Sequence, residues 1–437
     1  MVESVIANTL LGCVIGTFAG FIPGTGLLVS LMLMYPYLLT LDLISLLSFY
    51  IGLANLVQFT GSVTAIHFGL PGESNSVPAV QEGHGLAKQG HGHTAIVGTS
   101  LSSLTAGLLT TVILILLVPF YQNIFSFFYK SFNQLVIFSL TLLIFLFASN
   151  NKWYITLFLM MFGYLLGKVG FNEYTGEHFL TFGNIDLSTG IPVFPVILGF
   201  LVVPHLTKSY KFSKVDNVSI FKWHDINLFF KNFKYSILGS TIGFVCGLVP
   251  GVSTVLATNL SHKISKWFDK SKGPSYKSLI SVEASNNSAI IVTLLPLIIL
   301  GIPITGSEAM LLSIMERNII DLNWNIVLQN NLEILIATSI FISLLVGLVV
   351  SWPMSGLFQK IIYATKKYIK FIVFIILIAT LLFTASQTNQ YWYYMWIFSL
   401  SSIAGLLLKK YDVLPLLFLF LLQNKLESTI IISYNLL

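Results

Sequence analysis

Residues 12–26 read G-C-V-I-G-T-F-A-G-F-I-P-G-T-G, with three glycines four positions apart ahead of a Pro-Gly pair. Glycines at this spacing line one face of an apolar helix and allow close packing against a neighbour. Pro23 and Gly24 then end that helix. The same spacing returns in residues 239–251, at Gly239, Gly243, Gly247, Pro250 and Gly251. Five matched positions predict a chain built from two related halves, and paired broken helices in two repeats are typical of transporters.

The composition of the 437-residue chain predicts an all-α, polytopic helical membrane protein. Hydrophobic residues make up 55% and charged residues only 9%, so one soluble core could not bury this much apolar surface. Apolar stretches separated by short polar loops predict about ten to twelve membrane elements of about 20 residues each, some of them broken or re-entrant helices. The clearest are 94–119, 134–149, 191–203, 327–352, 371–384 and 394–408.

The net charge of +6 and the two cysteines add few constraints on function. The lysines fall in loops that flank apolar segments, so the positive-inside rule explains them without a nucleic-acid partner. Cys13 and Cys246 lie in different apolar runs and have no neighbour at metal-ligand spacing. No basic run precedes the first apolar segment, and we expect that segment to be retained in the membrane.

The most basic segment, residues 208–234, lies between the two glycine-rich copies. It predicts a cytoplasmic linker joining a first transmembrane repeat, 1–207, to a second, 235–437. A second basic loop at 263–277 follows the second copy. Because both lysine clusters favour the cytoplasm, we expect the segment between them to return at Pro250-Gly251 as a re-entrant hairpin.

A second pair of motifs supports the duplication. Residues 69–75 read G-L-P-G-E-S-N, and residues 301–307 read G-I-P-I-T-G-S. Each motif ends an apolar run and opens onto small polar residues. Each half therefore carries two helix breaks in the same order, and we expect the four breaks to converge on one site.

At such breaks, freed backbone N–H groups favour an anionic group and freed carbonyls favour a cation. Small polar side chains beside them could donate to a carboxylate, although a single Ser or Thr more often bonds its own helix backbone. The predicted substrate- or ion-binding positions at the breaks are Pro23, Gly24, Thr25, Gly26, Pro71, Gly72, Ser74, Asn75, Pro250, Gly251, Ser253, Pro303 and Thr305.

The run E-A-S-N-N-S at residues 283–288 precedes a purely apolar stretch. A carboxylate and two amides are costly inside a membrane unless they have partners. Glu283, Asn286 and Asn287 are therefore candidates for a substrate or coupling-ion site, and the alternative is a capping cluster at the membrane surface. Glu73 and Glu308 present the same choice, with Glu308 also a candidate for facing water.

Residues 82–93 place three histidines close together, at His84, His91 and His93. Their spacing matches no usual zinc pattern, so we interpret the stretch as a polar loop between helices and expect no metal. The chain has no nucleophile elbow, Walker-type loop or His-Glu-x-x-His motif. We therefore expect no enzymatic activity and no cofactor other than a coupling cation, Na⁺ or H⁺. An intramembrane enzyme using Glu283 or the histidines is a remote alternative.

With these motifs together, the chain resembles the large membrane subunit (TctA type) of the tripartite tricarboxylate transporter family. The resemblance spans nearly the whole length. It is carried by residues 16–26, 61–72, 82–90, 163–170, 189–199, 243–251, 283–288 and 300–303.

The resemblance implies gradient-driven uptake of a carboxylate across a bacterial inner membrane. It also implies a small membrane subunit and a periplasmic solute-binding protein as partners, with Asn286, Asn287 and the Pro-Gly loops at the translocation site. Arg317 is the only arginine, so lysines or backbone dipoles must hold the carboxylate. The alternative function is a non-transporting sensor or scaffold that retains the transporter fold.

Overall fold

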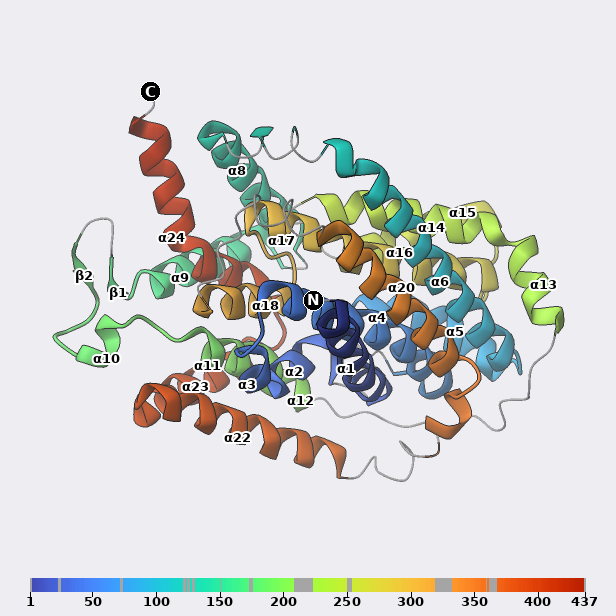
Figure 1. Cartoon of the computed structure of the whole chain (residues 1–437), viewed down its shortest axis with the longest axis horizontal. Helices are drawn as coiled ribbons and strands as arrows, with labels where there is room; N and C mark the ends of the chain where they lie inside the picture. Colours follow the sequence, from blue (N-terminus) through green and yellow to red (C-terminus); the bar gives the residue numbers. More distant parts are fainter. Residues whose placement is uncertain are drawn as a thin grey trace.

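The computed structural model describes the chain except for residues 1, 23–24, 71–73, 121–122, 124–125, 128–129, 150, 173–175, 208–222, 250–253, 319–331, 359, 361–367 and 436–437. The described part is almost entirely helical (Figure 1). Up to residue 207 its elements are α1 (Val2–Phe21), α2 (Gly26–Leu33), α3 (Tyr35–Leu38), α4 (Leu43–Phe68), η1 (Ser74–Ser76), α5 (Val77–Lys88), α6 (Gly92–Leu117), η2 (Val118–Phe120), α8 (Ser131–Ala148), α9 (Trp153–Gly167), β1 (Gly170–Phe171), β2 (His178–Phe179), α10 (Ile185–Ser188), α11 (Val193–Ile197), η3 (Leu198–Val202) and α12 (Val203–Leu206).

The later elements are also helical. They are α13 (Trp223–Lys231), α14 (Phe233–Leu248), α15 (Thr254–Asp269), α16 (Tyr276–Val292), α17 (Leu294–Leu300), α18 (Gly306–Arg317), α20 (Leu332–Ser351), α22 (Ile369–Thr388), α23 (Tyr391–Leu407) and α24 (Leu414–Asn435). The two strands pair antiparallel, with Gly170 opposite Phe179, in a hairpin that projects from the left of Figure 1 beside α10.

Six helical segments in the described part are long and apolar enough to cross a membrane. They are Val2–Phe21, Leu43–Phe68, Gly92–Phe120, Tyr276–Leu300, Glu333–Ser351 and Phe371–Thr388. Shorter apolar helices accompany them at Asn133–Phe147, Trp153–Gly167, Val193–Leu206, Phe233–Leu248 and Leu414–Gln423. The prediction of an all-α, polytopic membrane protein is confirmed.

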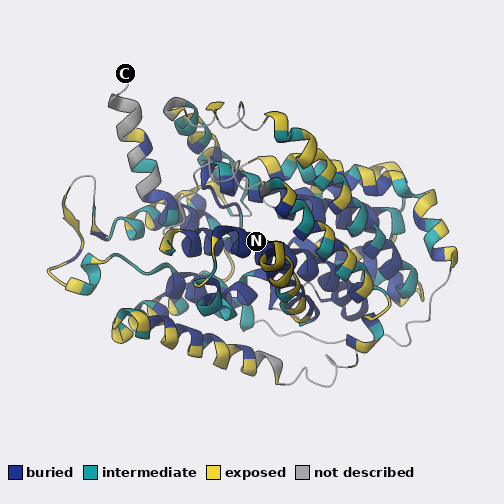
Figure 2. Ribbon diagram, viewed as in Figure 1, coloured by how far each residue is buried: buried dark blue, intermediate teal, exposed yellow. Residues whose placement is uncertain are grey.

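Helix α4 lies in the interior of the bundle, and every residue of it is buried (Figure 2). The glycine face of α1 packs directly against it. A methyl group at Gly12 would overlap the Phe49 carbonyl oxygen, and one at Gly16 would lie 2.6 Å from the Leu53 carbonyl oxygen. The glycines therefore serve the close helix packing that their spacing predicts.

The second glycine face makes the same kind of contact between α14 and α16. Methyl groups at Gly239 and Gly243 would overlap the carbonyl oxygens of Ser281 and Ser285. The later break is also alike in both halves, since α4 and α17 each end at a glycine in the left-handed conformation, Gly69 and Gly301 (φ +64° and +60°). The linker boundary at 208–234 stays a prediction, because residues 208–222 lie outside the described part.

Helix ends flank the first Pro-Gly pair in each half. Helix α1 ends at Phe21 and α2 begins at Gly26, while α14 ends at Leu248 and α15 begins at Thr254. The Pro-Gly residues themselves lie outside the described part. The flanking ends agree with the expected interruptions, and the sidedness of the expected re-entrant hairpin stays a prediction.

Candidate functional site

A cavity of about 470 Å³ is lined by residues from the segments that follow all four expected helix breaks. In the first half these are Thr25, after the first break, and Asn75, after the second. In the second half they are Thr254 and Thr305, which follow the third and fourth breaks. Residues far apart in the sequence therefore meet around a single volume large enough for a small organic molecule.

Three helices begin at this cavity. Their first residues, Gly26 of α2, Thr254 of α15 and Gly306 of α18, all line it. Gly26 has φ of +47°, a conformation that favours glycine. Each helix start carries partial positive charge from the helix dipole. The cavity therefore receives positive potential from helices of both halves.

The start of α18 differs from the others because the protein supplies its own carboxylate there. Glu308 Oε2 accepts from the N–H groups of Ile304 (2.6 Å) and Thr305 (3.1 Å), and the Glu308 N–H donates to Thr305 Oγ1. This is a complete capping box. Glu308 is fully buried, so a position facing water is wrong for it. The carboxylate uses the N–H groups that were expected to be free at this break.

The two threonines of the predicted set differ in their hydroxyl bonding. Thr25 Oγ1 donates to the backbone carbonyls of Ala19 (2.6 Å) and Ile22 (2.8 Å). Thr25 thus follows the alternative in which a hydroxyl satisfies nearby helix backbone. Thr305 Oγ1 instead accepts from the Glu308 N–H and caps the start of α18.

A chain of amides leads from the cavity into the protein interior. Asn75 Nδ2 donates to Asn286 Oδ1 at 2.8 Å, and Asn286 Nδ2 donates to Gln58 Oε1 at 2.5 Å. All three side chains are buried. The chain joins η1, α16 and α4, so it connects the two halves through hydrogen bonds that an apolar surrounding strengthens. Gln58 carries no sequence motif and was not among the predicted positions.

Glu283 and Asn287 lie on α16 beside this chain. Glu283 Oε2 accepts from Ser62 Oγ at 2.6 Å, and Asn287 Nδ2 donates to Ser103 Oγ at 2.8 Å. Both residues are buried in the interior of the helix, whose N-terminal cap is Ser275. The alternative interpretation of residues 283–288 as a capping cluster at a surface is therefore wrong. Two oxygens of the group, Asn75 Oδ1 and Asn287 Oδ1, are buried and accept no hydrogen bond from the residues that the structure describes.

The remaining predicted positions are described in full, in part or not at all. Pro303 is buried between α17 and α18. Ser74 belongs to η1, and its side chain lies outside the described part. Pro23, Gly24, Pro71, Gly72, Pro250, Gly251 and Ser253 lie outside the described residues.

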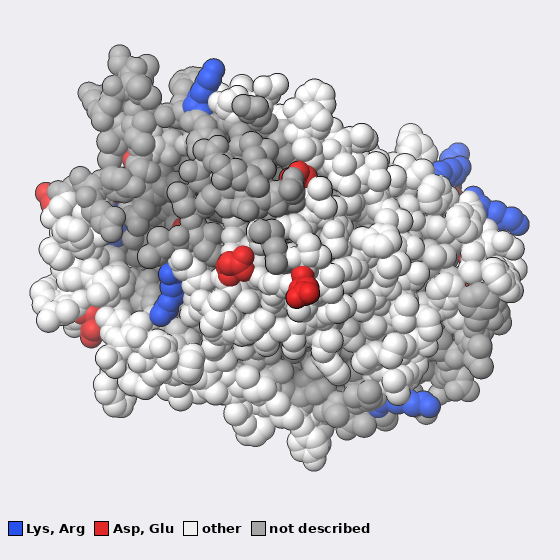
Figure 3. Space-filling model, viewed as in Figure 1, with Lys and Arg blue, Asp and Glu red and all other residues white. Residues whose placement is uncertain are grey.

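Cationic side chains are few on the visible face, where uncharged residues dominate (Figure 3). Two basic residues, Lys409 and His205, line the cavity. Arg317 instead donates from Nη1 to the Tyr35 hydroxyl at 3.5 Å. Lys409 is exposed at the edge of α23, a position from which a lysine can attract an anion into the cavity.

The histidine-rich stretch is not a loop. Residues 82–88 belong to α5, and α6 begins at Gly92, so the expected polar loop shrinks to a short turn. His93 Nδ1 and Thr94 Oγ1 instead contact the Asp225 carboxylate at 2.7 and 2.8 Å. Among the described residues, no group of three His, Cys, Asp or Glu side chains is placed to hold a metal ion.

The polar residues of α5 include one that sequence reasoning passed over. Glu82 is buried, and its carboxylate contacts His262, Lys266 and the backbone N–H of Ser275. Its partners are separated from it by about 180 positions or more, which no local pattern in the sequence could reveal.

Comparison with known proteins places this sequence in a family. Residues 6–419 match the model of the tripartite tricarboxylate transporter TctA family. A curated relative, the "Uncharacterized 52.8 kDa protein in TAR-I ttuC' 3'region" of Agrobacterium vitis, is 28% identical over 303 residues. That alignment covers 67% of this chain and spans 60% of the length of the relative. No solved structure matches the chain. Because the family model covers nearly the whole sequence, the chain belongs to the TctA family of membrane subunits of tripartite tricarboxylate transporters.

Proposed function

We propose that the chain is the translocating subunit of an uptake system that moves an organic carboxylate with Na⁺ or H⁺ across a bacterial inner membrane. The observation that carries this proposal is the single cavity at which α2, α15 and α18 begin and which Lys409 borders. The starts of α2 and α15 and the lysine favour a carboxylate, whereas Glu308 already occupies the start of α18. The cavity volume suits a small di- or tricarboxylate.

The coupling cation would bind near the start of the amide chain. Asn75 Oδ1 and Asn287 Oδ1 are unpaired acceptors, and the Glu283 carboxylate lies on the same helix as Asn287. Oxygen acceptors of this kind suit a hard cation, and a buried carboxylate suits a proton. Asn75 also lines the substrate cavity, so cation and carboxylate would meet at one residue.

The family description implies partner subunits, and we propose a small membrane subunit and a periplasmic solute-binding protein. The curated relative is longer than the aligned region, so activity, substrate and partners are proposals for this chain. Function as a sensor or scaffold that does not transport is the alternative that the same experiment addresses.

The test is uptake of labelled di- and tricarboxylates into vesicles that contain the chain with its candidate partners, with and without an imposed sodium or proton gradient. Accumulation of one carboxylate that depends on a gradient supports the proposal and identifies the coupling ion. Correctly inserted protein with both partners that accumulates none of the carboxylates under either gradient favours the sensor or scaffold.

A further inference from the structure

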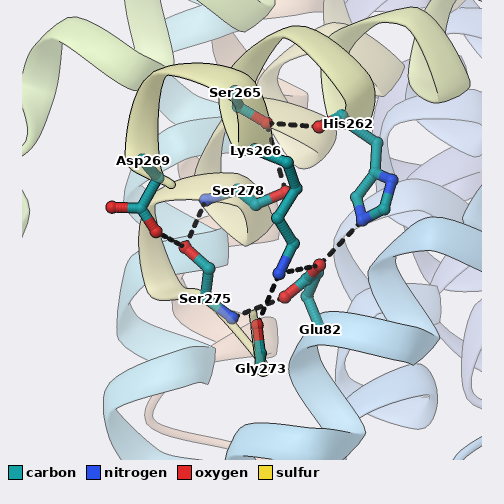
Figure 4. A network of polar contacts seen from close by, with 8 residues as sticks. All are labelled: Glu82, His262, Ser265, Lys266, Asp269, Gly273, Ser275 and Ser278. Carbon is teal, nitrogen blue, oxygen red and sulfur yellow. Dashed lines mark hydrogen bonds and ion pairs between the residues drawn. The ribbon is translucent and has the colours of Figure 1, made fainter. Parts of the chain in front are cut away.

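A buried carboxylate ties α5 to the connection between α15 and α16 (Figure 4). Glu82 Oε1 lies 2.7 Å from His262 Nε2 and 2.8 Å from Lys266 Nζ. Glu82 Oε2 accepts from the backbone N–H of Ser275 at 2.5 Å. Glu82 is only 3% exposed. A single side chain of the first half therefore holds three donors of the second.

The surroundings keep this carboxylate ionised. Burial alone would raise the pKa of Glu82, but hydrogen bonds from His262, Lys266 and the Ser275 N–H together bring that pKa below its usual value of 4.5. Loss of this carboxylate would leave the Ser275 N–H and the His262 and Lys266 side chains, which are each 22% exposed, without their buried acceptor. Removing the charge at Glu82 would therefore loosen the contact between the two halves at this point.

Helix α15 connects this tie to the cavity. It begins at Thr254, which lines the cavity, and carries Lys266 near its other end. At a rise of about 1.5 Å per residue the two residues are separated by roughly 18 Å along the helix. A hydrogen bond between the Ser261 and Ser281 hydroxyls and one from Ser265 to Ser278 fasten the middle of α15 to α16. Because α15 is one continuous helix, the position of Lys266 affects the position of Thr254 at the cavity.

We propose that Glu82 is a positioning residue for transport, holding α15 so that its first turn forms part of the cavity wall. This inference rests on the proposed function of the cavity, and it adds a residue that touches neither substrate nor ion. In this assignment, Lys266 and His262 serve as partners of Glu82, although Lys266 belongs to the basic stretch 263–277 that membrane sidedness alone explained.

A neighbouring ion pair provides a matched control. Asp269 Oδ2 accepts from Ser275 Oγ at 2.6 Å, and Asp269 Oδ1 accepts from Lys277 Nζ at 2.7 Å. These contacts join the last residue of α15 to the start of α16 and do not involve α5. Asp269→Asn removes a carboxylate from the same region, yet it leaves the Glu82 carboxylate and its contacts with α15 in place.

The experiment compares the wild-type chain with E82Q, K266Q and D269N, each in the complete transport system. The first readout is hydrogen exchange of the α15 amides without substrate, which does not depend on the transport proposal. The second is the KM and maximal rate of carboxylate uptake. For E82Q we expect exchange in α15 to rise about fivefold or more and KM to rise on the order of tenfold, with the maximal rate less affected. K266Q should change both readouts in the same direction and less strongly.

The D269N variant should stay within about twofold of wild type in α15 exchange and in KM. If E82Q does not insert into the membrane, K266Q decides by the same criteria. Wild-type values in both glutamate and lysine variants, or equal losses in E82Q and D269N, would overturn the assignment. Failure of the wild-type chain to accumulate any carboxylate contradicts the proposed function instead, and the exchange data then decide whether Glu82 holds α15.

Discussion

Asn75 and Asn286 are 211 positions apart in the sequence, and their side-chain amides share a hydrogen bond of 2.8 Å. Asn75 lines the cavity, while Asn286 lies on the buried helix α16. The bond therefore joins the segment after a helix break in one half to the central helix of the other. If one half moves relative to the other, this hydrogen bond must break or its two residues must move together. Substitutions at this pair therefore test the proposed site directly.

Replacing Asn286 with Ala should weaken both the fold and uptake. The change removes the acceptor for Asn75 and the donor to Gln58, and buried groups left unpaired cost about 1–3 kcal/mol. We expect a lower Tm in detergent and a loss of gradient-driven uptake. The matched control is Asn259→Ala, because the bond that the Asn259 amide makes in the described part stays within its own helix, to the Val255 carbonyl. Equal behaviour of the two variants would contradict a special role for Asn286.

Replacing Asn287 with Ala should lower uptake while the protein still inserts. Asn287 Nδ2 donates to Ser103 Oγ and to the Glu283 carbonyl, and its Oδ1 is an unpaired acceptor. If that oxygen binds the coupling cation, the variant needs a higher concentration of the driving ion for half-maximal uptake. Surface expression measured alongside uptake separates the two effects, and unchanged dependence on the ion would remove Asn287 from the site.

A methyl group at Gly243 should destabilise the bundle. The group would overlap the Ser285 carbonyl oxygen, and backbone can yield only if α14 and α16 move apart. Overpacking of this kind costs about 1–3 kcal/mol. We expect Gly243→Ala to lower the Tm clearly. Gly273→Ala is the control, because a methyl group there meets no other atom within 4 Å and φ is not positive. A similar Tm for both variants would show that the close helix contact does not limit stability.

The sequence revealed the features that repeat and missed those that depend on tertiary contact. Glycines four apart predicted that a helix face packs closely, yet they could not identify Phe49 or Ser281 as the residues contacted. The helix breaks were visible because Pro and Gly have local conformational effects. Their meeting around one cavity was only an expectation, since it depends on how whole helices pack.

Two residues, Gln58 and Glu82, show most clearly what could not be predicted from the sequence. Gln58 is one of two amides, with Asn55, in the largely apolar helix α4, so nothing local distinguished it from a residue bonded to its own helix. Glu82 belongs to a histidine- and glycine-rich stretch that favoured a loop, but burial against α4 and α16 stabilises a helix there. Tertiary packing decided both positions, and a single sequence contains little information about it.

Lys409 should contribute to capture of the carboxylate. Lys409 lines the cavity at which α2, α15 and α18 begin, whereas its neighbour Lys410 does not line that cavity. We expect Lys409→Gln to raise the KM for a tricarboxylate several-fold, roughly the effect of one partly exposed charge, and to reduce the dependence of KM on ionic strength. Lys410→Gln should leave both unchanged. The measurement is initial uptake at two salt concentrations, and equal effects of the two changes would contradict a local role for Lys409.

Acidification should weaken the fold in part through Glu82. Its folded-state pKa lies below the usual 4.5, so its contribution to stability is complete above the unfolded pKa and is lost as the pH falls through the folded one. The difference in Tm between wild type and E82Q should therefore shrink as the pH falls below about 4.5. Thermal unfolding in detergent at a series of pH values checks this. A difference that persists unchanged down to pH about 3, where an ordinary glutamate is protonated, would show that the Glu82 charge does not stabilise the contact between α5 and α15.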